Sequence, residues 1–387
     1  MTKSFDAIVI GAGVQGTSTA YHLTKAGFAR TLILDELEAA GRGSSGRSGS
    51  MLMKSRENRA KIEFSLYSYS WLLAFPEHFG EQLSFSKTGF LSLVPSSLRD
   101  RYLEEHQLRL DVGAPSRLLD QREIASIAPA VDTSGIEFGL LGPDDGVIDP
   151  DQLIRSYLKG AQAAGASLRL RTRVVGLDTS SGDGVRVDTT RGQFEAPIVI
   201  NAAGAGAAAI AKFVGLELPI QSLRRSLYFV SVPDTRLQTG PMVEESGVEW
   251  YFRGLGGDRV LVGMGLESDG GSSDAADLSF WDTVKATAAR RVPALQDAEV
   301  VGGTSGLRPL TPDILPIIGP APAAAGFYNN CGWGGEGIMH SPAGGRMAVD
   351  SITRTSTPGL DWHACQVERF NALAAPERSH QLEGEIE

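Results

Sequence analysis

The strongest constraint on the fold is a glycine-rich turn close to the N-terminus. Phe5–Ile10 is predicted to be a short buried strand, Gly11, Gly13 and Gly16 follow at the spacing G-x-G-x-x-G, and a helix is predicted over 17–26. In such a turn the first glycine permits a tight bend, the second lets a ligand approach the backbone, and the third lets the helix pack closely on the strand. The helix N-terminus then presents unpaired N–H groups to an anion. The pattern predicts a parallel βαβ unit that binds the diphosphate of a dinucleotide.

An acidic residue at the end of the next predicted strand strengthens this interpretation. The strand covers Thr31–Asp35, and Asp35 lies 19 residues after Gly16. At this spacing a carboxylate accepts hydrogen bonds from a ribose 2′-hydroxyl. It also disfavours a 2′-phosphate, and therefore NADP. Taken alone, the glycine-rich turn is also compatible with an α/β protein that binds no ligand there.

Length and charge restrict the class of protein further. A chain of 387 residues exceeds the roughly 250–300 at which one core stops growing, so we expect two packed regions, one inserted into the other. The formal net charge is −10 without a long basic run, which argues against a nucleic acid partner. We find neither a signal-peptide pattern nor an apolar stretch of the ~18–20 residues that span a bilayer, and expect a cytoplasmic protein without a transmembrane segment.

Cysteine and histidine give no sign of a metal site. Cys331 and Cys365 are the two cysteines, and neither they nor the six histidines have metal-ligand spacing. We therefore expect no metal. Demanding chemistry must come from an organic cofactor or from acid–base side chains.

The second glycine-rich segment, residues 41–50, follows the second strand almost at once. It is rich in small hydrogen-bond donors and contains Arg42 and Arg47, so it can wrap a second face of a diphosphate. Taken alone, it would be a flexible surface linker. Farther along, helices are predicted over 149–164, 207–214, 278–291 and 342–352, and residues 302–322 form a stretch rich in Pro and Gly.

Together these motifs resemble the D-amino acid oxidase-like family of FAD-dependent oxidoreductases. Within that family the chain is similar to sarcosine oxidase and dehydrogenase FAD subunits, glycine oxidase and D-amino acid dehydrogenases. The resemblance extends from Phe5 to about Ile352. The motifs that carry it are the first glycine turn, the loop 41–50, Val199–Gly204, the segment 306–319 and the loop 330–338.

The resemblance implies an α/β fold with a Rossmann-like FAD-binding domain. An inserted, discontinuous α+β substrate domain, built on a mainly antiparallel sheet, would complete it. We assign residues 1–80, 145–215 and 302–376 to the FAD-binding domain, residues 81–144 and 216–301 to the substrate domain, and residues 377–387 to a polar C-terminal tail.

The resemblance also implies which residues hold FAD. The first glycine turn and Asp35 would hold the ADP half, Ser44–Arg47 would follow the diphosphate and ribityl chain, and Val174 would contact the adenine through its backbone. Gly334–Ile338 would lie near the flavin ring, where a helix N-terminus stabilises negative charge. The complete predicted set is Gly11, Gly13, Val14, Gln15, Gly16, Asp35, Glu36, Ser44, Ser45, Gly46, Arg47, Ser48, Gly49, Val174, Ala203, Gly204, Arg308, Gly334, Gly335, Glu336, Gly337 and Ile338.

The flavin is predicted to be bound non-covalently. Family members with a cysteinyl flavin carry Cys where this chain has Gly306 or Leu307. Members with a histidyl flavin carry His where this chain has residues 48–51. Both attachment residues are thus missing.

Three residues are candidates for the catalytic site. Arg308 matches the arginine that binds a substrate carboxylate, Tyr251 matches an active-site tyrosine, and Arg225 matches a further pocket arginine. The alternatives are a structural ion pair for Arg308, a core position for Tyr251 and a solvent-facing charge for Arg225. Lys54 falls near a basic residue used by sarcosine-oxidising members, although we expect both Lys54 and Arg225 to face solvent.

Two further positions separate this chain from monomeric sarcosine oxidases. Met339 and Leu261 stand where those enzymes carry lysines, which makes a dehydrogenase with another electron acceptor than oxygen plausible. His340 and Cys331 lie near the predicted flavin loop, and we expect both to be packing residues.

The leading hypothesis is an enzyme that oxidises the C–N bond of an amino acid or N-alkyl amino acid by hydride transfer to flavin N5. The resulting imine would then hydrolyse. Its partners would be the amine substrate and oxygen or another electron acceptor, with homo- or hetero-oligomeric assembly left open. The alternatives are an FAD-dependent 2-hydroxy acid dehydrogenase and the FAD subunit of a hetero-oligomeric amine or opine dehydrogenase.

Overall fold

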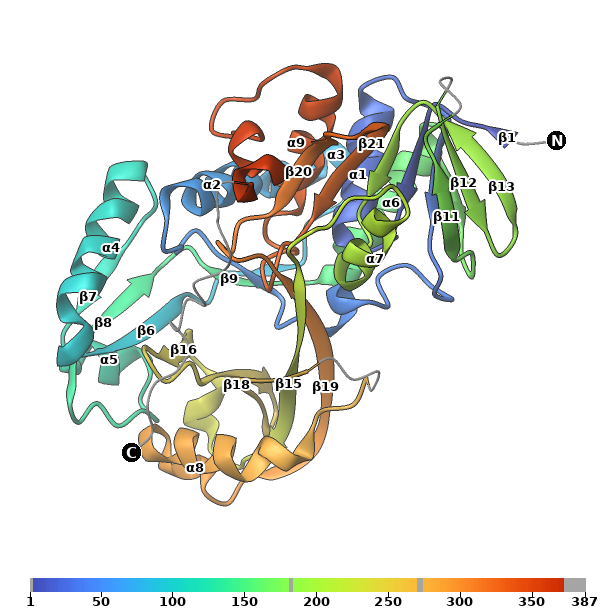
Figure 1. Cartoon of the computed structure of the whole chain (residues 1–387). Coiled ribbons are helices and arrows are strands. Elements are labelled where there is room, and N and C mark those ends of the chain that lie inside the picture. The colour runs from blue at the N-terminus through green and yellow to red at the C-terminus, as the bar shows by residue number, and fades with distance from the viewer. Residues whose placement is uncertain (1–2, 181–183, 270–273, 372–387) are drawn as a thin grey trace.

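The computed structural model of the chain describes residues 3–180, 184–269 and 274–371. The predicted polar tail, 377–387, lies outside these residues. The described part contains four sheets, in an upper part formed around α1 and a lower part formed around one large curved sheet (Figure 1). Strands β15 (Gln221–Ser231) and β19 (Glu299–Leu310) run between the two parts (Figure 1). No helix of the described residues is long and apolar enough to cross a membrane.

The six-stranded sheet carries the predicted glycine turn. Its order is β10-β3-β2-β14-β21-β20, and all neighbours are parallel except β20 and β21. Both faces of β2 and β3 are buried, as is typical of parallel strands covered on each side. The strands are β2 (Ala7–Ile10), β3 (Thr31–Leu34), β10 (Ser167–Arg169), β14 (Val199–Asn201), β20 (Ile317–Ala321) and β21 (Ala324–Cys331).

Helix α1 (Val14–Lys25) is buried over almost its whole length, because it packs against both α6 (Pro150–Ala163) and α9 (Ser341–Thr353). Glycines make the contact with α9 possible. A Cβ placed on Gly345 would lie 2.7 Å from Nδ1 of His22. The hydroxyl of Ser18 also donates to the Ser341 carbonyl at 2.6 Å. These contacts join the start and the end of the chain around one core.

The eight-stranded sheet has the order β19-β15-β18-β17-β16-β6-β8-β7 and is antiparallel except between β16 and β6. Helix α8 (Trp281–Arg291) covers its lower side (Figure 1). The strands are β6 (Phe90–Pro95), β7 (Arg117–Leu119), β8 (Ile136–Gly142), β15 (Gln221–Ser231), β16 (Met242–Glu245), β17 (Tyr251–Gly256), β18 (Arg259–Asp269) and β19 (Glu299–Leu310).

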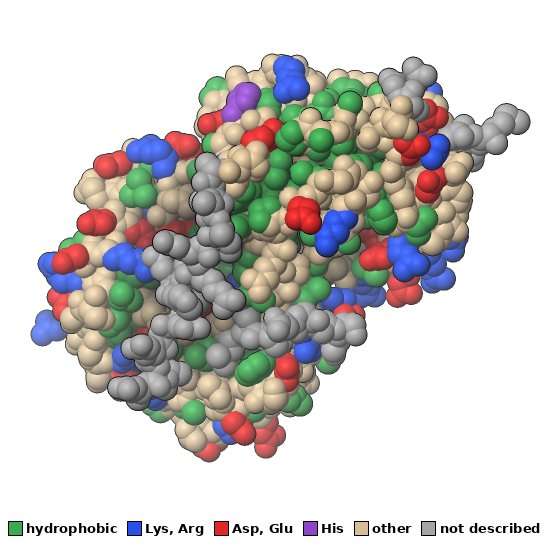
Figure 2. Space-filling model, in the orientation of Figure 1, with side chains coloured by type: hydrophobic (Ala, Val, Ile, Leu, Met, Phe, Trp, Pro, Cys, Tyr) green, Lys and Arg blue, Asp and Glu red, His purple; other side chains and the backbone are tan. Residues whose placement is uncertain are grey.

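Smaller elements complete the described fold. The three-stranded sheet is β4 (Met51–Leu52), β9 (Gly146–Ile148) and β5 (Phe85–Ser86), and the four-stranded sheet is β1 (Lys3–Ser4), β13 (Gly192–Ala196), β12 (Val185–Thr189) and β11 (Val174–Asp178). The other helices are α2 (Arg59–Leu73), α3 (Phe75–Phe79), α4 (Arg99–Val112), α5 (Gln121–Ile127) and α7 (Ala207–Lys212). Charged side chains of both signs are interspersed over the face seen in Figure 2.

The structure confirms the predicted α/β class with a mainly antiparallel second sheet. Pro and Gly residues argue against strands, yet the stretch 302–322 contains β20 and most of β19. Strand β19 pairs with β15 through Leu310, so residues 302–310 of the predicted FAD-binding domain lie in the eight-stranded sheet. The domain boundaries as a whole stay a prediction.

The first testable prediction concerns Gly16. A Cβ at this position would overlap the Gly11 carbonyl, which is backbone and cannot rotate away. We expect Gly16→Ala to lower the free energy of unfolding by about 3 kcal/mol, the upper end for overpacking a tight site. Urea unfolding followed by circular dichroism measures this change.

Gly43→Ala is the matched control, because a Cβ there would have no neighbour within 4 Å and the φ of −74° suits any residue. Equal urea midpoints for the two variants would contradict the packing role of Gly16.

Candidate cofactor and substrate site

One continuous cleft of about 2120 Å³ runs from the first glycine turn to the eight-stranded sheet. Drug-sized ligands occupy pockets of roughly 300–1,000 Å³, so this cleft has room for a dinucleotide and a second small molecule. Gly11, Asp35 and Val174 line one end, and Tyr251, Arg225 and Arg308 line the other.

Hydrogen bonds hold four distant segments of the cleft wall together. The amide of Val14 donates to the Ser45 hydroxyl at 3.1 Å, and the Ser44 hydroxyl donates to the Leu307 carbonyl at 2.5 Å. The side chain of Gln15 donates to the Gly337 carbonyl at 3.0 Å. The first glycine turn, the loop 41–50 and the loop 334–338 therefore form one wall.

The N-terminus of α1 opens into this wall. Its N-cap is Gly13, which has extended backbone and provides no side-chain cap to the first turn of the helix. A Cβ on Gly13 would lie 3.3 Å from the Ser45 hydroxyl oxygen, so glycine keeps the approach to these amides wide. Backbone N–H groups and the helix dipole at this point favour a phosphate.

Asp35 lies at the end of β3, as predicted for a ribose ligand. Its Oδ2 accepts a hydrogen bond from the Ala12 amide at 2.6 Å, and its Oδ1 accepts one from the Leu37 amide at 2.8 Å. These bonds fix the carboxylate at the cleft edge next to Val174, the buried first residue of β11. Each oxygen keeps a second lone pair for a ligand.

Almost all of the predicted cofactor set lines the cleft. Gly16 and Gly46 are the two members that do not line it. A Cβ on Gly46 would lie 2.6 Å from the Gly41 carbonyl, so this glycine lets its loop fold back on itself, as Gly16 does for α1. Both act through packing. The assignment of the remaining residues to FAD stays a prediction.

The three predicted catalytic residues lie at the other end of the cleft. The Arg308 guanidinium lies over Gly335, where a Cβ would be 2.9 Å from its Cζ. The Tyr251 ring lies over Gly263 of the neighbouring strand, where a Cβ would be 2.5 Å from the hydroxyl. Arg225 donates to the Gly265 carbonyl at 3.3 Å. Glycines thus clear the space into which these side chains fold.

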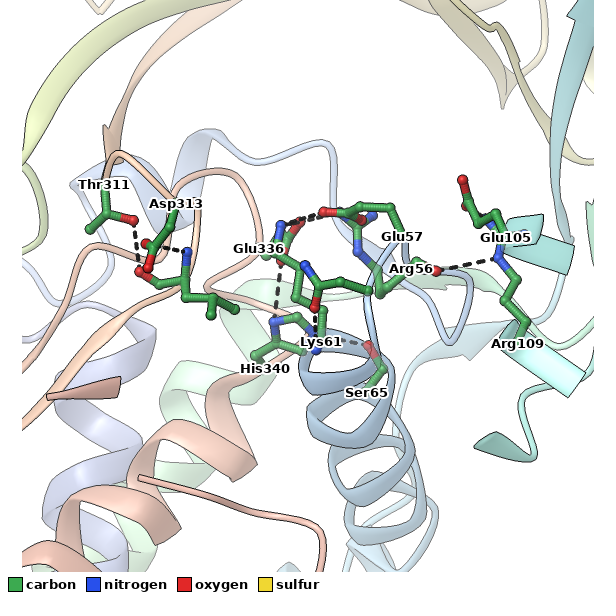
Figure 3. Close-up of polar contacts among 12 residues, drawn as sticks. Arg56, Glu57, Lys61, Ser65, Glu105, Arg109, Thr311, Asp313, Glu336 and His340 are labelled. Atoms are coloured by element: carbon green, nitrogen blue, oxygen red, sulfur yellow. Dashed lines mark hydrogen bonds and ion pairs between the residues drawn. The ribbon is translucent and has the colours of Figure 1, made fainter. Parts of the chain in front are cut away.

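A network of partly buried ion pairs around Glu336 lines the cleft (Figure 3). Glu336 accepts from both Arg56 and Lys61, the latter at 3.0 Å. Glu57 also pairs with both, at 2.9 Å to Arg56 and 2.6 Å to Lys61. The two cations and two carboxylates are balanced, and the cations hold the pKa of Glu57 down at about 2 against the opposing effect of its burial.

His340 and Cys331 are both buried packing residues, as expected from the sequence. Burial lowers the pKa of His340 to about 4, so the ring is neutral at pH 7, with Nε2 2.8 Å from the Ser65 hydroxyl. Burial raises the pKa of Cys331 to about 12, which leaves a protonated, unreactive thiol.

Two expectations about exposure were wrong. Lys54 does not face solvent: its ammonium lies 2.7 Å from Asp144 and 3.9 Å from the centre of the Tyr69 ring. The Arg225 side chain is only 12% exposed and lies 3.7 Å from Glu249. Both cations stay inside because a carboxylate and other partners replace water.

Sequence reasoning also missed Arg56, Glu57 and Lys61 as residues of the cleft wall. They precede or begin α2, where charges normally face solvent. The Glu57–Lys61 spacing of four residues was a helical ion-pair signal, yet it gave no sign of burial.

The fold and the cleft define a dinucleotide-binding α/β protein of the oxidoreductase type. The sequence matches the FAD-dependent oxidoreductase (DAO) family over residues 6–351. The chain belongs to this family, and FAD is the cofactor of the family.

Individual relatives agree with this assignment. The chain is 27% identical to mitochondrial sarcosine dehydrogenase of Homo sapiens over 98% of its own length and 44% of that protein. It is 26% identical to glycine oxidase of Geobacillus kaustophilus over 92% of its length and 95% of that enzyme. It thus spans less than half of the sarcosine dehydrogenase and nearly all of the glycine oxidase.

Solved structures show the same fold. Glycine oxidase from Geobacillus kaustophilus superposes with a TM-score of 0.84 at 25% identity, covering 95% of this chain and 99% of that one. L-proline dehydrogenase from P. horikoshii superposes with a TM-score of 0.88 at 24% identity, covering 96% and 99%.

The second testable prediction concerns the ion network. Lys61 is buried between Glu57 and Glu336, and its removal leaves two carboxylates with one cation, Arg56. We expect Lys61→Met to lower the free energy of unfolding by about 3 kcal/mol, the lower end for breaking a buried pair. Urea unfolding of the purified protein measures this loss.

The control lies on the same helix. Arg59 is 59% exposed and pairs with Glu63 at 3.6 Å. Arg59→Met should therefore cost less than about 1 kcal/mol. A Lys61→Met variant as stable as Arg59→Met would show that the network does not hold α2 to the loop 334–338.

Proposed function

We propose that the chain is an enzyme that oxidises the C–N bond of an amino acid or N-alkyl amino acid, with FAD bound non-covalently. The relatives support this substrate class: sarcosine and dimethylglycine dehydrogenases and glycine oxidase are all among them. A cytoplasmic location, and oxygen or another molecule as final electron acceptor, are part of the same proposal.

One observation carries the proposal. Arg308 faces the same end of the cleft as Tyr251, and its guanidinium lies directly against Gly335 of the predicted flavin loop. A guanidinium there can bind a carboxylate through two parallel hydrogen bonds. The carboxylate of an amino acid would thus be anchored beside the predicted ring site.

The residues of the cleft fit FAD. The N-terminus of α1 suits a diphosphate, the Asp35 carboxylate suits a ribose, and the loop 334–338 lines the same cleft. Bound FAD supplies the hydride acceptor. The protonated Cys331 thiol supports a non-covalent flavin, because thiolate is the form that attacks a ring carbon.

The protein's own part in the reaction is to position the substrate. Arg308 holds the carboxylate, and the Tyr251 hydroxyl can donate a second hydrogen bond to it. Orientation of the C–H bond by these two contacts lowers the entropy cost of the reaction. Residues of β16 and β17 line this part of the cleft together with Met53 and Phe90, and these apolar side chains help to exclude water.

A partner-dependent subunit is the second candidate. The chain covers 44% of sarcosine dehydrogenase and 43% of the mouse regulatory subunit of pyruvate dehydrogenase phosphatase, another relative. Size measurement and flavin reduction by the isolated chain separate the two candidates. Anaerobic flavin bleaching by 2-hydroxy acids alone would reject the amino acid proposal.

The third testable prediction is made for Arg308. Loss of a charged hydrogen-bond partner costs about 1.5–3 kcal/mol, so Arg308→Ala should reduce kcat/KM for amino acids about 10- to 150-fold. Anaerobic flavin reduction by an amino acid panel gives this value.

Arg259→Ala, on an exposed position of β18, should keep the wild-type kinetics. Unchanged kinetics in Arg308→Ala, with normal flavin content, would remove Arg308 from the substrate site.

A further inference from the structure

Glu244 is an acidic residue in the substrate end of the cleft that the proposed reaction does not use. It lies on β16, lines the cleft and is directly opposite Tyr251 of β17 in the antiparallel register. Residues opposite each other in such a pair project from the same face of the sheet. Glu244 and Tyr251 therefore face the cleft together.

The carboxylate of Glu244 is held in place by one neighbour. The buried hydroxyl of Ser92, on β6, donates to its Oε1 at 2.7 Å. Within the described part of the chain this is the hydrogen bond that the Glu244 side chain makes. No cation of the described residues lies within ion-pair distance of the Glu244 carboxylate. Oε2 is thus left for a ligand.

The surrounding charges do not neutralise Glu244. Arg56 is shared between Glu57 and Glu336, which also hold Lys61, and Arg109 pairs with Glu105 (Figure 3). These groups balance one another. Among these neighbouring charges, the Glu244 carboxylate is the one without an ion pair.

Glu244 is also distant from Arg308 along the sheet. In the order β19-β15-β18-β17-β16, the strand of Glu244 is four places from the strand of Arg308. Across the cleft the two are linked through their neighbours: Arg308 lies against Gly335, the adjacent Glu336 pairs with Arg56, and the charge of Arg56 acts on Glu244. The α-nitrogen of an amino acid lies one carbon from the carboxylate, so the part of a ligand held at Arg308 that would meet Glu244 is its side chain.

We propose that Glu244 selects substrates with a second, non-reacting cationic nitrogen at the end of the side chain: basic amino acids and their N-alkyl derivatives. This inference rests on the proposed function, because it takes Arg308 as the carboxylate anchor. The side-chain cation donates to Oε2 of Glu244, while Ser92 keeps the carboxylate turned toward the cleft. An uncharged side chain of equal length cannot pair with the Glu244 carboxylate, and this difference gives the specificity.

The test compares lysine with norleucine, which have the same carbon chain, in both stereoisomers and as N-methyl derivatives. Anaerobic flavin reduction by the holoenzyme gives kcat/KM for each. We expect at least a tenfold preference for the cationic member, as for a charged hydrogen bond. Glu244→Gln should bring the ratio close to one, and Glu244→Asp should restore part of it.

Glu137→Gln is the matched control. Glu137 is on β8 of the same sheet and also accepts from a serine, Ser96, at 2.9 Å, but it is exposed and does not line the cleft. This variant should keep the wild-type preference. Flavin content of each variant confirms that it is folded.

The pH dependence gives a second readout. Burial raises the pKa of Glu244, and Glu105 adds to this effect, whereas Ser92, Arg56 and Arg109 oppose it. Tyr102 also faces it, with a pKa raised by burial to about 12, and is neutral throughout. The preference for lysine should fall on acidification as Glu244 is protonated, starting at a higher pH than for an exposed glutamate, and Glu244→Gln should show no such change.

The outcomes separate this inference from the function on which it rests. Equal reduction by lysine and norleucine, or a preference that survives in Glu244→Gln, would overturn the role of Glu244 and leave the amino acid oxidation intact. Failure of every amino acid to reduce the flavin would overturn both.

Discussion

The close backbone approach at the first glycine turn is the constraint on which the site depends. Gly16 brings the first turn of α1 against the Gly11 carbonyl, and Gly13 leaves the helix amides open toward the cleft. Gln15, in the same turn, then reaches the loop 334–338. A bulkier turn would move the helix N-terminus, and with it the wall that the ends of the chain build together.

The second constraint is electrostatic. The cleft wall contains partly buried Arg, Lys and Glu side chains whose charges are matched within the protein, because their contact with water is limited. The ion pairs of Glu336 with Arg56 and Lys61 link α2 to the loop 334–338. This matching also makes an unmatched carboxylate such as Glu244 informative, since burial without a partner is costly unless a ligand supplies the partner.

Much of the cofactor half could be predicted from sequence, because glycine spacing and strand ends are local signals. The turn at Gly11, the acid at Asp35 and the loop around Ser45 all line the cleft as expected. Strand β19 was missed because its Gly and Pro residues argue against a strand, and here its long pairing with β15 overrides that preference. Helix α4 was missed because, apart from Arg109, it buries little and has weak apolar periodicity.

The sequence by itself determined the family, the dinucleotide-binding turn and the residue types at the substrate end, since these depend on short-range spacing and on ordered motifs. Only the tertiary structure decided which charges meet. Lys54 with Asp144, Lys61 with Glu336, and Glu244 with Ser92 are pairs separated by 90 or more residues. Such pairs form because strand order and helix packing bring distant side chains into positions with little contact with water, where a partner in the protein replaces it.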